Sequence, residues 1–183
     1  MTAARDELQR LLAARAFRWG DFVLASGRRS DYFFDAKQVT LDGRGLHLAA
    51  SLMLARCREL RVSAVAGDDG VGPLLGAILA LSAEDEGPPL RAFMIRKAEK
   101  QHGTAARIAG PEPTAGERVA LIEDVVTTGG SAFRALEVLA PTGVVVTEVL
   151  VLVDREEGAA AALHEAALPL HALFRRSEFT ARA

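Results

Sequence analysis

The sequence predicts a single α/β domain built around a mostly parallel sheet. From Gly43 onward, stretches with apolar residues at helical spacing alternate with short β-branched runs. Those runs are almost uninterrupted in their apolar character, which is typical of parallel strands covered by helices on both faces. A length of 183 residues and an apolar content of 50% suit one compact domain with a substantial core.

The region before the sheet predicts a helix followed by a hairpin. Apolar residues recur at helical spacing from position 8 to position 17. Two aromatic-rich, β-prone stretches follow at 22–24 and 32–35, and the Ser-Gly-Arg sequence at 26–28 supplies a turn between them. We expect residues of about 1–40 to form a small hood next to the main sheet.

The core elements are expected to follow between residue 43 and about residue 175. The predicted helices cover about 43–60, 73–82, 130–140 and 157–167. The predicted strands cover 62–66, 91–95, 118–122, 144–153 and 170–174. The segment 97–116 is polar, contains two prolines and has no apolar period. Because loops of this length in compact domains are often functional, we expect a mobile loop there.

The composition argues against several classes of protein. Lysine and arginine number 22 and aspartate and glutamate 24, so the chain lacks the strong basic field that nucleic-acid binding usually needs. The single cysteine, Cys57, excludes an intrachain disulfide framework and a multi-cysteine zinc site, and it favours a reducing, cytoplasmic location. We expect no signal peptide, and no run approaches the roughly 18 apolar residues of a membrane span.

The most informative motif is the run 119–131, Val-Ala-Leu-Ile-Glu-Asp-Val-Val-Thr-Thr-Gly-Gly-Ser. It predicts a buried strand that ends in two acids and turns into a helix, and ligands of open α/β sheets bind at such carboxyl ends. Successive backbone N–H groups and the positive end of the following helix would form a cradle for a phosphate. Glu123 and Asp124 stand where carboxylate oxygens could hold a ribose diol or a hydrated Mg²⁺. The expected cradle residues are Val125, Val126, Thr127, Thr128, Gly129, Gly130 and Ser131.

A plain helix cap, a Walker-type loop and a dinucleotide-binding loop fit the glycine-rich turns less well. An ordinary helix cap after an acidic strand end leaves two adjacent acids without a reason. A Walker-type loop would need a Gly-Lys-Ser/Thr element, which the run 119–131 lacks. The turn at 67–76 is a near miss of the dinucleotide-binding fingerprint, because its third glycine is one place late and Pro73 interrupts it. The acids at 84–86 also lie in a loop, where that fingerprint requires a strand end.

The run 119–131 resembles the phosphoribosyl-diphosphate signature of the type I phosphoribosyltransferases. That resemblance implies a twisted parallel sheet flanked by helices, a small N-terminal hood and a flexible catalytic loop. It also implies that the Thr/Gly turn binds the 5-phosphate, that the acids face the ribose hydroxyls, and that the turn at 67–73 touches diphosphate. Mg²⁺ would be held mainly through the substrate.

Three further segments are similar to the orotate phosphoribosyltransferases within that family. Arg-Lys-Ala-Glu-Lys-Gln-His-Gly at 96–103 resembles the catalytic loop, and Ser-Gly-Arg-Arg-Ser-Asp-Tyr-Phe-Phe-Asp at 26–35 resembles the base-binding hairpin. Val-Asp-Arg at 153–155 would place an arginine opposite the orotate carboxylate. The residues so implied are Arg96, Lys97, Lys100 and His102 for the sugar diphosphate, Lys100, His102 and Asp124 for catalysis, and Phe33, Phe34, Thr127 and Arg155 for orotate.

The implied reaction is the transfer of a phosphoribosyl group from 5-phosphoribosyl 1-diphosphate to orotate in pyrimidine (UMP) biosynthesis. Loop cations would stabilise the departing diphosphate while the closed loop excludes water. An arginine supplies the planar, bidentate donor that a carboxylate requires. Members of the family are dimers whose loop reaches into the partner's site, so the resemblance also implies a homodimer.

The sequence departs from the family at three places. Ala25 stands where many members have lysine, the turn 67–73 contains no lysine, and Asp31 replaces a frequent proline. Two alternatives stay open: transfer to another base such as a purine, or a non-catalytic regulator that senses a nucleotide and binds RNA. The near-neutral charge and the cations of 96–102 favour the enzyme over the regulator.

Overall fold

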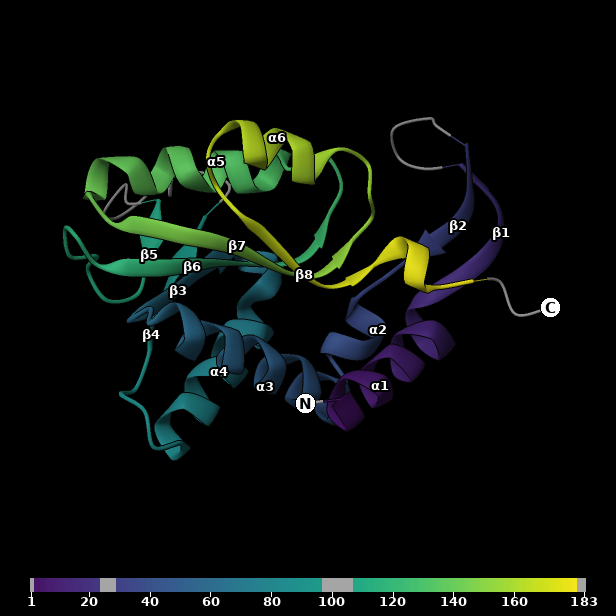
Figure 1. The fold of residues 1–183 in the computed structure, drawn as a ribbon, viewed down its shortest axis with the longest axis horizontal. Coiled ribbons are helices and arrows are strands. Elements are labelled where there is room, and N and C mark those ends of the chain that lie inside the picture. The colour runs from purple at the N-terminus through teal and green to yellow at the C-terminus, as the bar shows by residue number, and fades with distance from the viewer. Residues whose placement is uncertain (1, 24–28, 97–106, 181–183) are drawn as a thin grey trace.

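The computed structural model of the chain describes residues 2–23, 29–96 and 107–180. Its main sheet has six strands in the order β5-β4-β3-β6-β7-β8 (Figure 1). The strands are β3 Ala64–Asp68, β4 Arg91–Ile95, β5 Ile108–Ala109, β6 Arg118–Val126, β7 Val145–Asp154 and β8 Leu170–Arg175. All neighbours are parallel except β4 and β5. The predicted fold class, a mostly parallel sheet flanked by helices, is confirmed.

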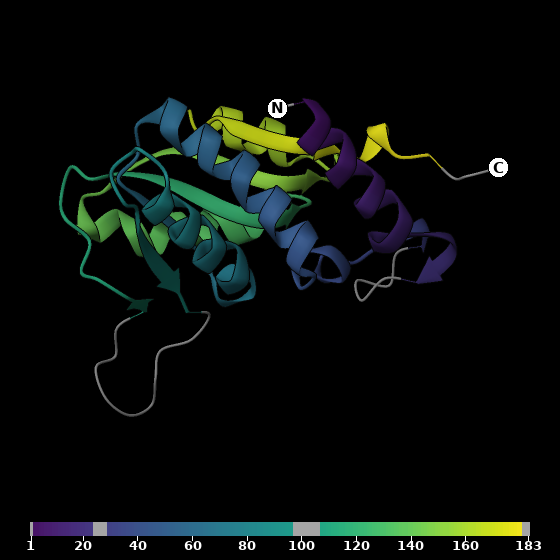
Figure 2. The ribbon, with the colours of Figure 1, turned by 90° about the horizontal axis from the view of Figure 1, so that it is seen from below.

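Helices cover both faces of this sheet. α3 (Gly43–Leu60) and α4 (Gly72–Glu84) lie side by side on one face, and α5 (Gly130–Leu139) and α6 (Ala159–Glu165) lie on the other (Figures 1 and 2). Successive strand residues alternate between the two sides. Ile122 and Leu150 belong to the core beneath α3 and α4, whereas Leu121 and Val149 belong to the core beneath α5. Burial on both faces explains why these strands are apolar throughout.

The N-terminal region forms the predicted helix and hairpin, with different boundaries. The elements are α1 Thr2–Leu11, a π-helical turn Leu12–Ala16, β1 Phe17–Val23, β2 Arg29–Phe34 and a short helix α2 Lys37–Thr40 that the sequence did not indicate. The helix does not extend to Phe17, which is the first residue of β1 and pairs with Phe34. Its ring packs 4.5 Å from Phe34 and 4.3 Å from Phe179, so tertiary packing overrides the local helical pattern. The predicted turn 26–28 lies outside the described residues.

Strand β6 continues past the position where the sequence predicted its end. It runs to Val126, so Glu123 and Asp124 lie within the strand and not at its terminus. The neighbour on one side, β3, pairs with β6 only as far as Leu121, while β7 pairs with it up to Val126. The last residues of β6 therefore have a strand on one side only, and this leaves an open edge beside the two acids.

The polar segment expected at 97–116 is bounded by ordered strands. Residues 97–106 lie outside the described residues, and β5 lies in the part that follows. The backbone N–H of Arg96 donates to the carbonyl of Arg107 at 2.8 Å. Arg96 and Arg107, the described residues on either side of 97–106, are thus side by side at the carboxyl end of β4. None of the helices in the described ranges is long and apolar enough to cross a bilayer.

Candidate active site

The turn between β6 and α5, residues 127–129 (hereafter the phosphate turn), presents free backbone donors. Gly129 has φ +86°, a left-handed conformation that strains other residues. Its carbonyl accepts from Phe133 N–H, and the carbonyl of Thr127 accepts from Ala159 N–H, each at 3.0 Å. Within the described residues, the N–H groups of 128–132 donate to no other backbone group. Because Gly129 is also the N-cap of α5, these donors and the helix dipole together form a site suited to a phosphate.

The two acids of β6 lie in a poorly hydrated place. Glu123 is only 5% exposed, and this burial raises its pKa to about 7. The charge of Asp68 adds to the rise, while a hydrogen bond from the Ser131 hydroxyl opposes it. The pKa of Asp124 is also raised, again chiefly by burial. Near neutral pH the Glu123 carboxyl can therefore either donate or accept a hydrogen bond.

Replacing Glu123 by glutamine is expected to increase stability at pH 8 more than at pH 5.5. In the folded protein the carboxyl keeps its proton up to a pKa of about 7, whereas in the unfolded chain it ionises near 4.5. The folded state therefore loses stability as the pH rises between these values, by roughly 3 kcal/mol in total. Urea unfolding of both proteins at the two pH values measures the difference. A difference that does not change with pH would contradict the raised pKa.

A cavity of about 150 Å³ lies next to the turn, between the carboxyl ends of β3 and β4 and the start of α5. Two of its lining residues, Arg96 and Ser131, were predicted site residues. Two further cations, Arg107 and Arg134, were not. The full lining is Asp68, Ile95, Arg96, Arg107, Ser131, Arg134 and Ala135.

The two additional arginines differ in how far the sequence could have revealed them. Arg134 stands four residues after Gly130, so both lie on one face of α5. A Cβ atom placed on Gly130 would lie 3.5 Å from the Arg134 Nη1 atom, so this guanidinium sits over the turn. The four-residue spacing between Gly130 and Arg134 could therefore have predicted from the sequence that this arginine lies near the turn. Arg107 reaches the cavity only because β5 pairs with β4, and no local pattern announces that pairing.

Arg155 lies outside this cavity and faces the hairpin. Its backbone N–H donates to the carbonyl of Val126 at 2.9 Å, which connects it directly to the residue before the phosphate turn. Its Nε–H donates to the Tyr32 hydroxyl at 2.8 Å, and its Nη2 atom forms an ion pair with Glu157 at 3.0 Å. The guanidinium is therefore held in one place between the sheet and the hairpin.

The two phenylalanines predicted to contact the base have different environments. Phe33 is 41% exposed, and its ring lies 5.9 Å from Phe22 on the paired strand. Phe34 is buried in the core, so it can reach a ligand only through its backbone. Both stay predictions as base contacts.

The structure thus brings part of the predicted site together. The acids of β6 and the turn surround one region with Arg96, while Arg155, Phe33 and Phe34 gather at the hairpin. Val126 is buried and can contribute only its backbone. Lys97, Lys100 and His102 lie outside the described residues, so Asp124 is the one predicted catalytic residue that the described part of the chain places.

The sequence is similar to curated proteins over nearly its whole length. The orotate phosphoribosyltransferase of Rhodopseudomonas palustris (strain BisB5) is 42% identical over 185 residues, covering 99% of this chain and 98% of that protein. The orotate phosphoribosyltransferase of Bradyrhizobium sp. (strain BTAi1 / ATCC BAA-1182) is 40% identical, covering 97% and 98%. No family model matches the sequence.

Solved structures give the same picture. The Mycobacterium tuberculosis H37Rv orotate phosphoribosyltransferase in complex with 5-phospho-alpha-D-ribosyl 1-diphosphate aligns with a TM-score of 0.78 at 31% identity, over 96% of this chain and 98% of that one. The orotate phosphoribosyltransferase from Aeropyrum pernix aligns with a TM-score of 0.75 at 34% identity, over 95% and 94%. The similarity includes the hairpin as well as the main sheet, because nearly all of each chain is covered.

Proposed function

The chain belongs to the orotate phosphoribosyltransferase family, and we propose that it transfers the phosphoribosyl group of 5-phosphoribosyl 1-diphosphate to orotate. The products are orotidine 5′-phosphate and diphosphate, a step of pyrimidine biosynthesis. One observation carries the proposal: a turn of free amides, the buried Glu123 with its half-buried neighbour Asp124, and three arginines lie around the end of β6, and Arg155 donates to the Val126 carbonyl directly before that turn.

The ribose 5-phosphate is assigned to the turn. Its oxygens would accept from the N–H groups after Thr127, that of Ser131 included, and from the hydroxyl of Thr128. Glu123 and Asp124 lie beside the turn and would bind the ribose hydroxyls. The burial of Glu123 supports this role, because a buried carboxyl forms stronger hydrogen bonds to a ligand than a hydrated one.

The leaving diphosphate is assigned to the cavity lined by Arg96, Arg107 and Arg134. As the bond from the anomeric carbon to the diphosphate oxygen breaks, charge accumulates on the leaving group and the bond to the base nitrogen forms. Fixed cations stabilise that charge without reorganising. We propose that Lys97, Lys100 and His102, which lie between Arg96 and Arg107 in the sequence, help to stabilise the same negative charge.

Substitution of Arg134 by glutamine is expected to raise the KM for 5-phosphoribosyl 1-diphosphate by about 10-fold and to leave the KM for orotate unchanged. The guanidinium lies over the turn and lines the cavity, so its loss weakens binding of the charged substrate alone. Initial rates with each substrate varied in turn give both constants. Equal increases in the two values would argue against a specific contact.

Mg²⁺ is the proposed cofactor, and the donor set suits it. The charges of Asp68 and Asp124 both raise the pKa of Glu123, so a cation beside these carboxyls would be favoured, and carboxylate oxygens are ligands that Mg²⁺ prefers. No group of three His, Cys, Asp or Glu in the described ranges is arranged to hold a metal ion. We therefore propose that the substrate supplies most of the ligands. When bound, the ion would neutralise part of the diphosphate charge.

Orotate is assigned to the space between the turn and the hairpin. The Arg155 guanidinium would bind the carboxylate, while Thr127 and the backbone of Phe33 and Phe34 would contact the ring. We further propose that the chain acts as one cytoplasmic domain, with hood, core and the catalytic loop 97–116, in a homodimer whose loop completes the partner's site.

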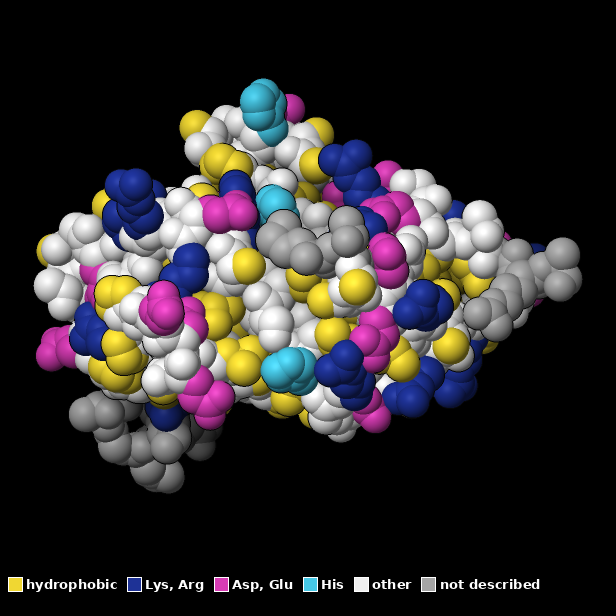
Figure 3. All heavy atoms as spheres, turned by 60° about the horizontal axis from the view of Figure 1, so that its bottom comes forward, with side chains coloured by type: hydrophobic (Ala, Val, Ile, Leu, Met, Phe, Trp, Pro, Cys, Tyr) yellow, Lys and Arg dark blue, Asp and Glu magenta, His cyan; other side chains and the backbone are white. Residues whose placement is uncertain are grey.

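The experiment that tests the function is orotate-dependent release of diphosphate, measured with and without Mg²⁺. We expect release with orotate and no release with guanine, hypoxanthine or adenine. Consumption of a purine in place of orotate would overturn the base assignment and keep the transferase. On the face shown in Figure 3, basic and acidic side chains are interspersed and form no continuous basic surface, which speaks against an RNA-binding regulator.

A further inference from the structure

Tyr32 lies between the hairpin and two guanidinium groups. It is 6% exposed, and its ring centre is 4.9 Å from the Arg155 guanidinium and 5.0 Å from that of Arg176. Arg176 lies equally close to the ring of Trp19, at 5.0 Å. Cations at such distances from aromatic rings are attracted by the ring electrons, more strongly when water is excluded. The Tyr32 hydroxyl also accepts the 2.8 Å hydrogen bond from Arg155 Nε–H.

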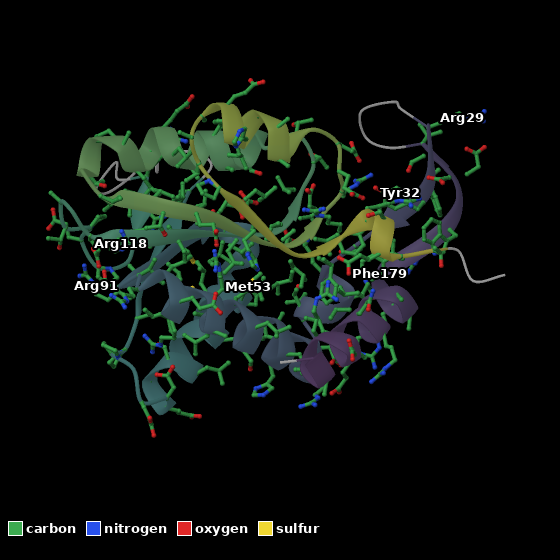
Figure 4. The ribbon with its side chains drawn as sticks, in the orientation of Figure 1. Arg29, Tyr32, Met53, Arg91, Arg118 and Phe179 are labelled. Atoms are coloured by element: carbon green, nitrogen blue, oxygen red, sulfur yellow. The ribbon has the colours of Figure 1, made fainter. Side chains whose placement is uncertain are left out.

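The C-terminal turn Arg176–Glu178 is fastened to the same region (Figure 4). Phe179, which follows it, is buried against Phe17. The backbone N–H of Ser177 donates to the Glu156 carboxylate at 2.7 Å, and its hydroxyl donates to the other carboxylate oxygen at 3.1 Å. Glu156 is the neighbour of Arg155 in the chain. The last described residues of the protein therefore hold both the hairpin and the segment that carries Arg155.

These contacts restrict the orientation of the Arg155 side chain. A free arginine has many rotamers, and fixing one of them on binding costs conformational entropy. Here the Tyr32 hydroxyl accepts from Nε–H, and Glu157 pairs with Nη2. A guanidinium carries five N–H donors in a rigid plane, so fixing two of its nitrogens fixes the direction of all of them. The group is thus preorganised to meet a planar anion.

We propose that Tyr32 is a positioning residue for Arg155, and that Arg176 in the C-terminal turn holds Tyr32 in the orientation this requires. The inference rests on the proposed function, since it assigns to these two residues the fixing of the orotate-binding arginine. Neither residue needs to touch the base. The predicted consequence is a loss confined to orotate, because the phosphate turn and the cavity of Arg96 contain neither of them.

Tyr32→Phe is the decisive variant, because it keeps the ring and removes only the hydroxyl. We expect the KM for orotate to rise about 10-fold, with the KM for 5-phosphoribosyl 1-diphosphate and kcat within about 2-fold of wild type. Arg176→Ala should act in the same direction, and Arg176→Lys should restore part of the loss because lysine also binds aromatic faces. Val23→Ala, an exposed position of the same hairpin, is the matched control and should have no effect.

Several outcomes would overturn the inference. Far-UV circular dichroism and the midpoint of urea unfolding report whether each variant is folded. An unchanged orotate KM in folded Tyr32→Phe, or equal changes for both substrates, refutes the positioning role. If Tyr32→Phe does not fold, the two Arg176 variants decide: an unchanged orotate KM in Arg176→Ala, or no recovery of the orotate KM in Arg176→Lys, refutes the positioning role. Wild-type protein that does not use orotate at all refutes the proposed function itself. If wild-type protein uses orotate and folded Tyr32→Phe uses it equally well, only the inference is refuted.

Discussion

Replacement of Arg155 by alanine is expected to lower kcat/KM for orotate by about 1000-fold, with the KM for 5-phosphoribosyl 1-diphosphate within about 2-fold of wild type. The arginine is the cation proposed to meet the orotate carboxylate, and it is largely screened from water by Tyr32 and Glu157. Without it, a carboxylate would enter the site unpaired, and desolvation makes this costly. The phosphate turn keeps its own donors, so binding of the sugar diphosphate should persist.

Steady-state kinetics with each substrate varied in turn measures this effect. Arg155→Lys should recover only part of the loss, because an ammonium group cannot form the bidentate contact. Arg118→Ala is a matched control, since Arg118 begins β6 at the opposite end of the sheet and donates to the Leu60 carbonyl (Figure 4). An Arg155→Ala enzyme that uses orotate as well as Arg118→Ala does would show that the carboxylate is recognised elsewhere.

Replacement of Lys100 by alanine is expected to lower kcat by roughly 100-fold to 1000-fold with a modest change in both KM values. An interaction made mainly with the departing diphosphate acts on the transition state more than on the bound substrate. Lys100 itself lies outside the described residues. The described ends of its segment, Arg96 and Arg107, are joined by a 2.8 Å hydrogen bond and both line the cavity assigned to the diphosphate.

The comparison variant for this prediction is Lys100→Arg, which keeps a positive charge and should retain a larger share of the turnover number. Single-turnover measurements would separate the chemical step from product release. A turnover number in Lys100→Ala equal to that of wild type would remove this lysine from the mechanism and leave the described arginines as the source of the stabilising charge.

The sequence by itself determined the elements whose residues interact mainly with near neighbours in the chain. α3 and β4 begin and end where their apolar patterns predicted, at 43–60 and 91–95. The phosphate turn was equally accessible, because a nest of amides is made by consecutive residues and its glycines are visible in the sequence. The acids beside it were found for the same reason.

Only the tertiary structure decided the features that depend on a distant partner. β6 ends at Val126 because β7 continues to pair with it after β3 has stopped. Phe17 leaves the N-terminal helix because Phe34 and Phe179 bury its ring. Arg107 reaches the cavity through strand pairing, and Tyr32 and the C-terminal turn meet Arg155 only through the folding of the chain. Local propensity cannot encode such contacts, because their free energy comes from burial and pairing between segments that are distant in the sequence.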